Sequence, residues 1–92
     1  MKRRDLLQAV SEVLFYEWDP IGINDKPLCR GEYDSYAPSI CRLLSEGADA
    51  HKIARHLEQL QRSSMGLSEI DLDRDAQVAR RLISLVKPDR KL

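Results

Sequence analysis

Apolar residues recur at every third or fourth position along most of the chain, which is the spacing of amphipathic α-helices. The first stripe extends over residues 4–17 without an internal glycine or proline. Its apolar members are Leu6, Leu7, Val10, Val13, Leu14 and Trp18. Asp19-Pro20 is expected to end this helix, because the residue before a proline is disfavoured in the helical region.

A turn and a long connection follow the first stripe. The sequence Asp-Pro-Ile-Gly at 19–22 matches the preferences of a type I turn, with Asp first, Pro second and Gly fourth. Residues 23–31 show no apolar period, so one long loop over about residues 19–32 is predicted. Loops of that length in a small domain are often functional or mobile.

A second apolar stripe covers residues 33–44. Asp34 or Ser35 is the expected N-cap, because either side chain can accept a hydrogen bond from a free N–H of the first turn. Pro38 falls in or just after that turn, where a missing N–H costs least. Gly47 follows the stripe and is expected to end the helix.

A third helix is predicted to begin at the cap Asp49 and to reach about Ser64, where Gly66 terminates it. Asp71 or Asp73 is expected to cap a fourth helix, whose positive N-terminal end suits the acidic residues there.

The fourth stripe covers residues 76–86, and Lys87-Pro88 is expected to end it. No segment alternates with the period of a strand, so no sheet is predicted. The pattern therefore favours the all-α class, as a compact bundle of about four amphipathic helices with one long loop. The length of 92 residues corresponds to a single domain over 1–92.

The net charge and the length of the apolar segments limit the kinds of partner and compartment that we expect for this protein. Lys and Arg number 15, as do Asp and Glu, so the formal net charge is zero and gives no argument for nucleic acid or an anionic membrane. The basic start is not followed by the apolar segment of a signal peptide, and the longest apolar run, 13–16, is far too short to span a bilayer. We therefore expect a cytoplasmic protein without a membrane partner, in which Cys29 and Cys41 stay reduced.

No arrangement of residues indicates catalysis or a metal. His51 and His56 are five positions apart, so they point in different directions from one helix and make a poor ligand pair. The chain has no Gly-x-Ser-x-Gly motif, and its glycines never cluster into a phosphate-binding loop. The expectation is that the protein is not an enzyme and uses no cofactor and no metal.

Nucleic-acid binding is one alternative. Residues 47–57 have the rhythm of the first helix in helix-turn-helix proteins, and Arg55, Arg62, Arg80 and Arg81 supply positive charge. A recognition helix should follow after three or four residues, whereas the third helix is predicted to continue and acids come next. A small helix-turn-helix-like DNA-binding regulator therefore stays an alternative, as does a structural or interaction protein of another kind.

The segment over residues 15–36 is the least ordinary part of the chain. It contains all five aromatic residues, and its five acids outnumber its two bases, a local charge of 2 − 5 = −3. Aromatic side chains with an acidic rim are typical of a protein-binding patch for a basic partner. Anchoring of the loop onto the core by the aromatic rings is the competing interpretation.

Three blocks of sequence resemble a known family: Glu-Trp-Asp-Pro-Ile-Gly at 17–22, Glu-Tyr-Asp-Ser-Tyr at 32–36 and Met-Gly-Leu at 65–67. They are similar to small bacterial proteins called YugE-like, a helical domain of unknown function, over roughly residues 14–67. The resemblance implies a small, all-helical, cytosolic protein with no assigned catalytic activity. It also implies a link to immunity proteins that neutralise bacterial toxins, because some relatives resemble them.

The leading hypothesis is a protein-binding module, an immunity protein that binds and occludes a basic bacterial toxin domain. Acidic residues would steer the partner, and aromatic residues would anchor it. The candidate partner-binding residues are Trp18, Asp19, Asp25, Glu32, Tyr33, Asp34 and Tyr36.

Overall fold

The computed structural model describes residues 3–86, and this range contains four α-helices and no strand. The helices are α1 (Arg3–Val13), α2 (Ala37–Ser45), α3 (Ala50–Gln59) and α4 (Leu72–Ser84). The predicted all-α class is confirmed. The stop predicted at Lys87-Pro88 lies outside the described residues.

Short helical turns extend this framework. The π-helical turn η1 (Leu14–Trp18) continues α1, and a second π-helical turn, η4 (Leu60–Ser64), continues α3. The connection between α1 and α2 contains two 3₁₀ turns, η2 (Pro27–Cys29) and η3 (Asp34–Tyr36). The long loop is therefore present as predicted, and short helical turns break it up.

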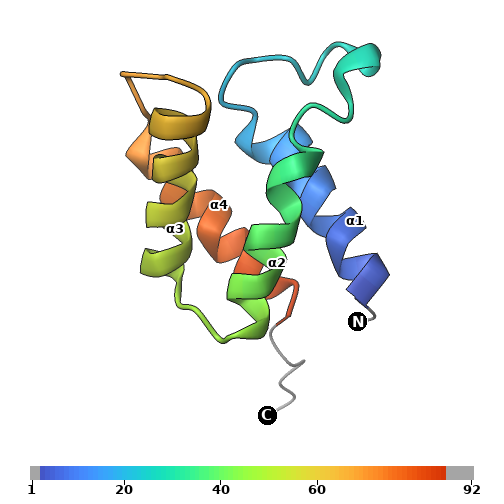
Figure 1. Cartoon of the computed structure of the whole chain (residues 1–92), viewed down its shortest axis with the longest axis vertical. Coiled ribbons are helices and arrows are strands. Elements are labelled where there is room, and N and C mark those ends of the chain that lie inside the picture. The colour runs from blue at the N-terminus through green and yellow to red at the C-terminus, as the bar shows by residue number, and fades with distance from the viewer. Residues whose placement is uncertain (1–2, 87–92) are drawn as a thin grey trace.

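The helices pair as two hairpins. The most extensive contact is between α3 and α4, and α1 packs against α2. α4 joins the pairs by contacting both α1 and η1, whereas α2 and α3 touch little. Figure 1 shows α3 on one side, α1 and α2 on the other, and α4 between them. The connections that follow η1 and η4 lie at the same end of the bundle.

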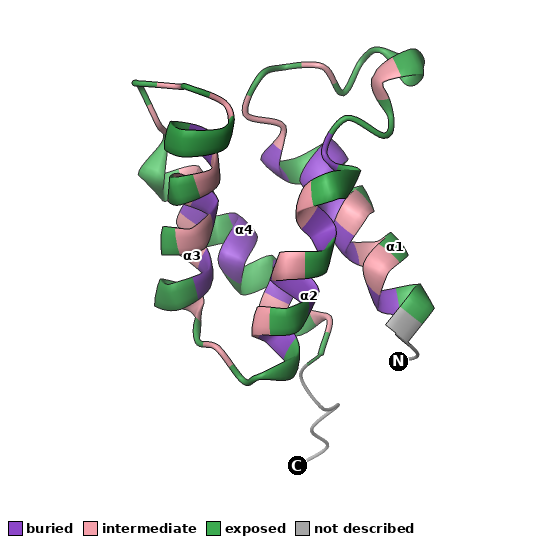
Figure 2. Ribbon diagram, viewed as in Figure 1, coloured by how far each residue is buried: buried purple, intermediate pink, exposed green. Residues whose placement is uncertain are grey.

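The predicted apolar stripes face inward (Figure 2). Each helix contributes fully buried aliphatic side chains, such as Val10, Ile40, Ile53 and Leu82. The aromatic residues Phe15, Trp18 and Tyr33 close the core at the end that carries the long connections. Burial of a large apolar side chain contributes about 1.5–3 kcal/mol, so this aromatic end is a main source of stability.

Two of the three expected N-caps are confirmed. Asp49 accepts a hydrogen bond from the Lys52 N–H at 2.9 Å, and Asp71 accepts one from the Arg74 N–H at 3.0 Å. The third expectation, a cap at Asp34 or Ser35, is wrong, since α2 begins later and has no side-chain cap. The turn η3 leads directly into α2 and supplies backbone carbonyls for its first N–H groups, so no side-chain acceptor is needed.

The predicted turn at residues 19–22 is also present. The Gly22 N–H donates to the Asp19 carbonyl oxygen at 3.2 Å, and Gly22 has a φ of 69°. Asp19 itself lies in the left-handed region with a φ of 36°, which the sequence pattern did not indicate.

Gly22→Ala is expected to lower the free energy of unfolding by about 1 kcal/mol, because an L-residue is strained in the left-handed region. An added Cβ meets no atom within 4 Å, so the backbone alone accounts for the cost. Urea unfolding measures the effect. Gly22→Asn is the control, since asparagine tolerates this conformation better, and equal stability of Gly22→Ala and the parent would contradict the assignment.

Candidate functional site

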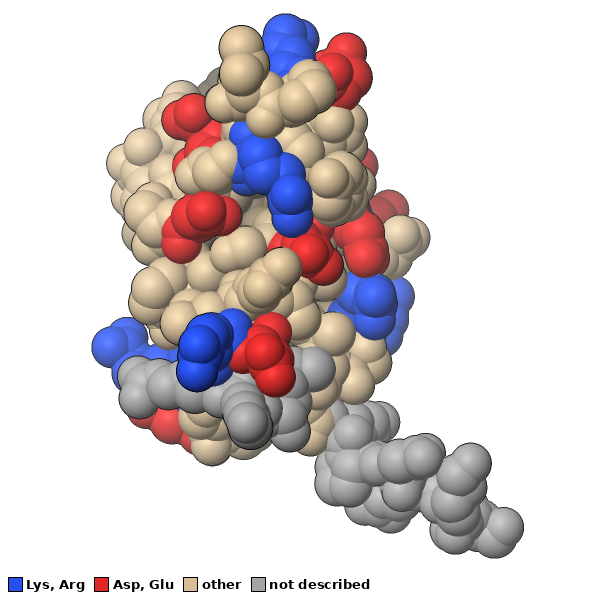
Figure 3. Space-filling model, turned by 90° about the vertical axis from the view of Figure 1, so that its right-hand side faces the viewer, with Lys and Arg blue, Asp and Glu red and all other residues tan. Residues whose placement is uncertain are grey.

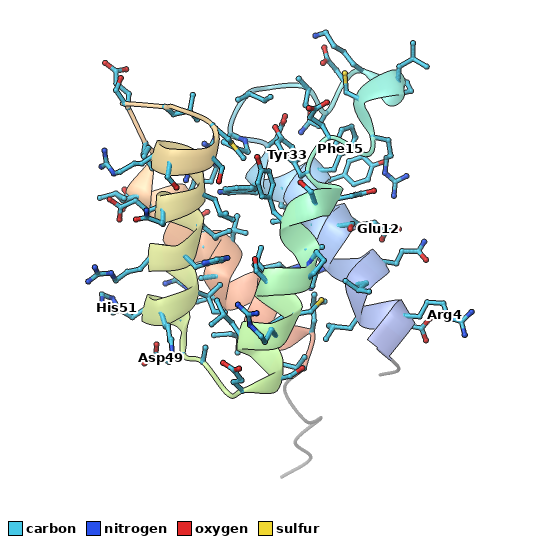
Figure 4. All side chains as sticks on the ribbon, viewed as in Figure 1. Arg4, Glu12, Phe15, Tyr33, Asp49 and His51 are labelled. Carbon is cyan, nitrogen blue, oxygen red and sulfur yellow. The ribbon has the colours of Figure 1, made fainter. Side chains whose placement is uncertain are left out.

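Trp18 and Tyr33 belong to the core. Their exposed fractions are 0% and 1%, so the expectation that they form a partner-binding surface is corrected in favour of loop anchoring. The Trp18 ring lies 5.6 Å from the ring of Tyr33 and 6.4 Å from that of Tyr36. Figure 4 shows Phe15 and Tyr33 next to each other under the long connection, with ring centroids 6.5 Å apart.

A buried carboxylate joins the two hairpins. Asp75, 1% exposed, accepts a hydrogen bond from Trp18 Nε1 at 3.0 Å. Gln61 Nε2 lies 3.0 and 2.9 Å from its two carboxylate oxygens and also donates to the Leu57 carbonyl oxygen at 3.1 Å. Trp18 comes from η1 and Gln61 from η4, so both donors to Asp75 are supplied by the π-helical turns. π-Helical turns are frequent at functional sites, but here they serve a structural contact.

Burial raises the pKa of Asp75 above its ordinary value. The hydrogen bonds from Trp18 and Gln61 and the charge of Arg74 act in the opposite direction, while Glu58 adds to the rise. The carboxylate thus bears a desolvation cost that its donors partly offset, which is the usual condition for a buried charged group. We assign Asp75 a structural role.

Asp19 holds the turn and the start of the loop. Its Oδ1 accepts hydrogen bonds from the Ile23 N–H and the Tyr33 hydroxyl, both at 2.8 Å. Its Oδ2 accepts one from the Asn24 N–H at 3.0 Å. Burial alone would raise the pKa of Asp19, but these hydrogen bonds outweigh it and the pKa is lowered. Asp19 was predicted as part of an acidic binding rim, and its carboxylate is instead occupied inside the loop.

Tyr33 completes this arrangement. Its hydroxyl donates to Asp19 and accepts from the Ile21 N–H at 3.3 Å, so it ties the turn to the start of α2. Burial and the hydrogen bond to the Asp19 carboxylate both raise the pKa of Tyr33. The hydroxyl therefore stays protonated and keeps its donor function at any physiological pH.

The other end of the loop is attached to α1 through Arg30. The guanidinium carbon lies 5.9 Å from the ring centroid of Phe15 and 5.3 Å from that of Tyr16. Arg30 also forms an exposed ion pair with Glu12 at 3.4 Å. Cation–π contacts at exposed sites contribute about 0.5–1 kcal/mol each, so Arg30 restrains the loop without burying it.

The remaining predicted residues do not form one surface. Asp25 is exposed at the outer part of the loop and pairs with Lys26 at 3.5 Å. Glu32 lines a small pocket together with Tyr33 and Tyr36, whereas Asp34 lines a separate groove beside Arg30. Charges of both signs alternate on the face shown in Figure 3. The acidic rim is therefore less uniform than the local charge of the sequence indicated.

Leu28 is a surface residue that the sequence analysis missed. It lies in η2, at the outer part of the long connection, and its side chain is fully exposed at 101%. Five large apolar side chains are exposed among residues 3–86, and three of them (Tyr16, Ile21 and Leu28) lie within residues 16–28. A leucine inside a polar, aperiodic stretch is the only feature of the sequence that pointed to it.

A contact between Ser39 and His56 was also missed. Ser39 Oγ lies 2.8 Å from His56 Nε2 and donates to the Tyr36 carbonyl oxygen at 3.1 Å. The hydroxyl has one hydrogen, so when Tyr36 receives it the imidazole must donate from Nε2 and cannot act as a base toward Ser39. Burial and the nearby charge of Arg42 lower the pKa of His56. The pair links α2 to α3.

Within residues 3–86, no three or more His, Cys, Asp or Glu side chains come together in a way that could hold a metal ion. No helix in that range combines the length and apolar character needed to cross a bilayer.

Comparisons with protein-family models, with curated proteins and with solved structures found no match to this chain. The resemblance to YugE-like proteins therefore remains a hypothesis from the sequence blocks alone.

Proposed function

We propose that this protein is a binding module for another protein and that the partner contacts the long connection between α1 and α2. The observation that carries the proposal is the position of Leu28: a fully exposed leucine on a loop that internal contacts hold in place. Removing this side chain from water would favour association, since full burial of a leucine is worth about 1.5–3 kcal/mol.

The restraint of the loop strengthens the proposal. Asp19 and Tyr33 hold one end of it through hydrogen bonds, and Arg30 holds the other end against α1. Ordering an interface side chain costs about 0.5–1.5 kcal/mol, so a loop that is ordered before binding loses less free energy on association.

The acids of the connection that carries Leu28 indicate the chemistry of the partner. Asp25, Glu32 and Asp34 are exposed on this connection, and they favour a basic protein surface. Together with the family resemblance, this supports the finer proposal of a cytoplasmic immunity protein that covers the basic active site of a toxin domain. The proposed mechanism is stoichiometric occlusion and involves no catalysis.

Leu28→Asp is expected to raise the dissociation rate from the partner about 30-fold or more, which corresponds to a hot spot of about 2 kcal/mol. Surface plasmon resonance measures the effect, with a basic toxin domain encoded next to the gene for this protein as the partner that the proposal requires. The melting temperature should not change, because the Leu28 side chain is fully exposed and is not part of the hydrophobic core.

Leu72→Asp is the matched control, since Leu72 is another exposed leucine but begins α4. It is expected to bind like the parent protein. Absence of binding by the parent to that toxin domain would refute the immunity proposal. Equal kinetics for both variants would refute the proposed surface.

The DNA-binding alternative receives no support from the arrangement of α3 and α4. A helix-turn-helix needs a short turn between its two helices. Here η4 and the connection over residues 65–71 separate them. The exposed arginine of η4, Arg62, also pairs with Glu58 at 3.0 Å.

A further inference from the structure

A pocket of about 240 Å³ lies where residues from the two hairpins meet. One wall comes from the connection between α1 and α2, and the other from η4 and the residue after it. The lining residues are Ile21, Glu32, Tyr33, Tyr36, Ser64 and Met65. Pockets for small-molecule ligands usually measure about 300–1,000 Å³, so this one suits a single side chain better than a whole metabolite.

The polar groups of this pocket are not used within the fold. The carboxylate of Glu32, the hydroxyl of Tyr36 and the hydroxyl of Ser64 form no hydrogen bond or ion pair with any residue in the range 3–86. The Tyr33 hydroxyl, in contrast, is occupied by Asp19. The residues that line the pocket thus carry one unpaired negative charge and two unpaired hydroxyls.

The shape and charge of the pocket indicate a cationic side chain with an apolar stem. Ile21 and Met65 provide aliphatic contact, and the half-buried Tyr36 provides an aromatic ring on which a cation can stack. Glu32 supplies the opposite charge. Arginine matches this set better than lysine, because its planar guanidinium group stacks on rings and pairs with a carboxylate through two parallel hydrogen bonds.

We propose that this pocket receives an arginine side chain presented by the protein partner. The inference rests on the proposed function for the source of the arginine. The pocket itself can be tested without the partner, because a blocked amino acid presents the same side chain.

The experiment is a ¹H–¹⁵N NMR titration of the full chain with N-acetyl-arginine amide up to millimolar concentration. The expected result is a saturable shift of backbone amides around the pocket, at Ile21, Tyr36 and Met65, with the Leu28 amide unchanged. N-acetyl-citrulline amide has nearly the same shape without the charge and is expected to bind about fivefold more weakly, because it cannot form the ion pair with Glu32.

Glu32→Gln is expected to weaken binding of the arginine probe about fivefold. The melting temperature should be unchanged, because the Glu32 carboxylate has no partner among the described residues. Glu46→Gln is the matched control, since Glu46 is an exposed glutamate at the C-terminal end of α2, away from the lining residues.

Three results would overturn the proposed arginine pocket: no shift of its amides, equal binding of the citrulline and arginine probes, or unchanged binding of the arginine probe by Glu32→Gln. These failures are distinct from failure of the proposed function. If the arginine probe binds but Leu28→Asp binds the partner as the parent does, the pocket is supported and the Leu28 surface is rejected. If Leu28→Asp weakens partner binding but the arginine probe does not bind, the Leu28 surface is supported and the pocket is rejected.

Discussion

Replacing Asp75 by alanine is expected to lower the free energy of unfolding by about 2–4 kcal/mol. The substitution removes the only acceptor that the structure shows for the indole N–H of Trp18, and it leaves the amide of Gln61 with the Leu57 carbonyl oxygen alone. A buried donor without an acceptor costs about 1–3 kcal/mol, which applies in full to the Trp18 N–H and in part to the Gln61 amide, since Gln61 keeps one of its acceptors. Urea unfolding followed by tryptophan fluorescence measures the change, since Trp18 is the only tryptophan.

Two further variants separate this effect from a general loss of helix stability. Asp75→Asn keeps one oxygen as an acceptor and is expected to cost less, about 1–2 kcal/mol. Asp73→Ala changes an exposed acid of the same first turn and is expected to cost under about 1 kcal/mol, through the helix dipole alone. Comparable losses for Asp73→Ala and Asp75→Ala would show that the buried hydrogen bonds contribute little.

The raised pKa of Asp75 also predicts the direction in which the free energy of unfolding changes with pH. In the window between its unfolded value of 3.8 and the higher folded value, the native state binds the proton more tightly than the unfolded state. The contribution of Asp75 to stability is therefore fully present below about pH 3.8 and is lost as the pH rises through the folded pKa. The stability of the parent relative to Asp75→Asn should accordingly decrease as the pH rises through this window.

Asp19→Ala is expected to lower the free energy of unfolding by about 2–3 kcal/mol. Part of the loss, about 1–2 kcal/mol, comes from placing alanine at a φ of 36°. The rest, about 1 kcal/mol, comes from the hydrogen bonds with Ile23, Asn24 and Tyr33, because their exposed or half-buried donors can bind water once the carboxylate is gone. Hydrogen exchange should be faster at the amides of Ile23 and Asn24, while the amides of α3 and α4 follow global unfolding.

Asp19→Asn is the control for the backbone term, because asparagine tolerates the left-handed region and keeps one acceptor. The lowered pKa gives Asp19 the opposite pH dependence to Asp75: its contribution is present above about pH 3.8 and is lost as the pH falls through the folded pKa. The Asn variant should lack this acid sensitivity. Unchanged exchange at Ile23 and Asn24 in Asp19→Ala would show that the carboxylate does not hold the loop.

The helices were predictable because each depends on local features. The apolar period, the caps Asp49 and Asp71 and the turn at 19–22 involve residues a few positions apart, and the structure confirms them. The start of α2 was not predictable in the same way, since backbone carbonyls of the 3₁₀ turn η3 take the place of the expected side-chain cap.

The candidate site was harder to predict, because its residues meet across the fold. Asp75 looks like any acid in a helical first turn, and only the packing of α4 against η1 buries it 57 positions away from Trp18. Tyr33 and Tyr36 are three positions apart, yet one is fully buried and the other half-buried. Composition showed that aromatic and acidic side chains gather here, but it could not separate those that hold the loop from those that face solvent.

The two π-helical turns determine where the chain can gain or lose a residue. A π-helical turn holds one more residue than an α-helical turn, and each helical residue advances the chain by about 100°. Deleting one residue from η1 or η4 would restore an α-helical turn and leave the residues on either side in nearly the same orientation, whereas a deletion inside α1 or α3 would rotate Trp18 or Gln61 by about 100° away from Asp75. Single-residue deletions inside α1 or α3 should therefore impair folding more than deletions in η1 or η4, and insertions beside the exposed Leu28 should be tolerated.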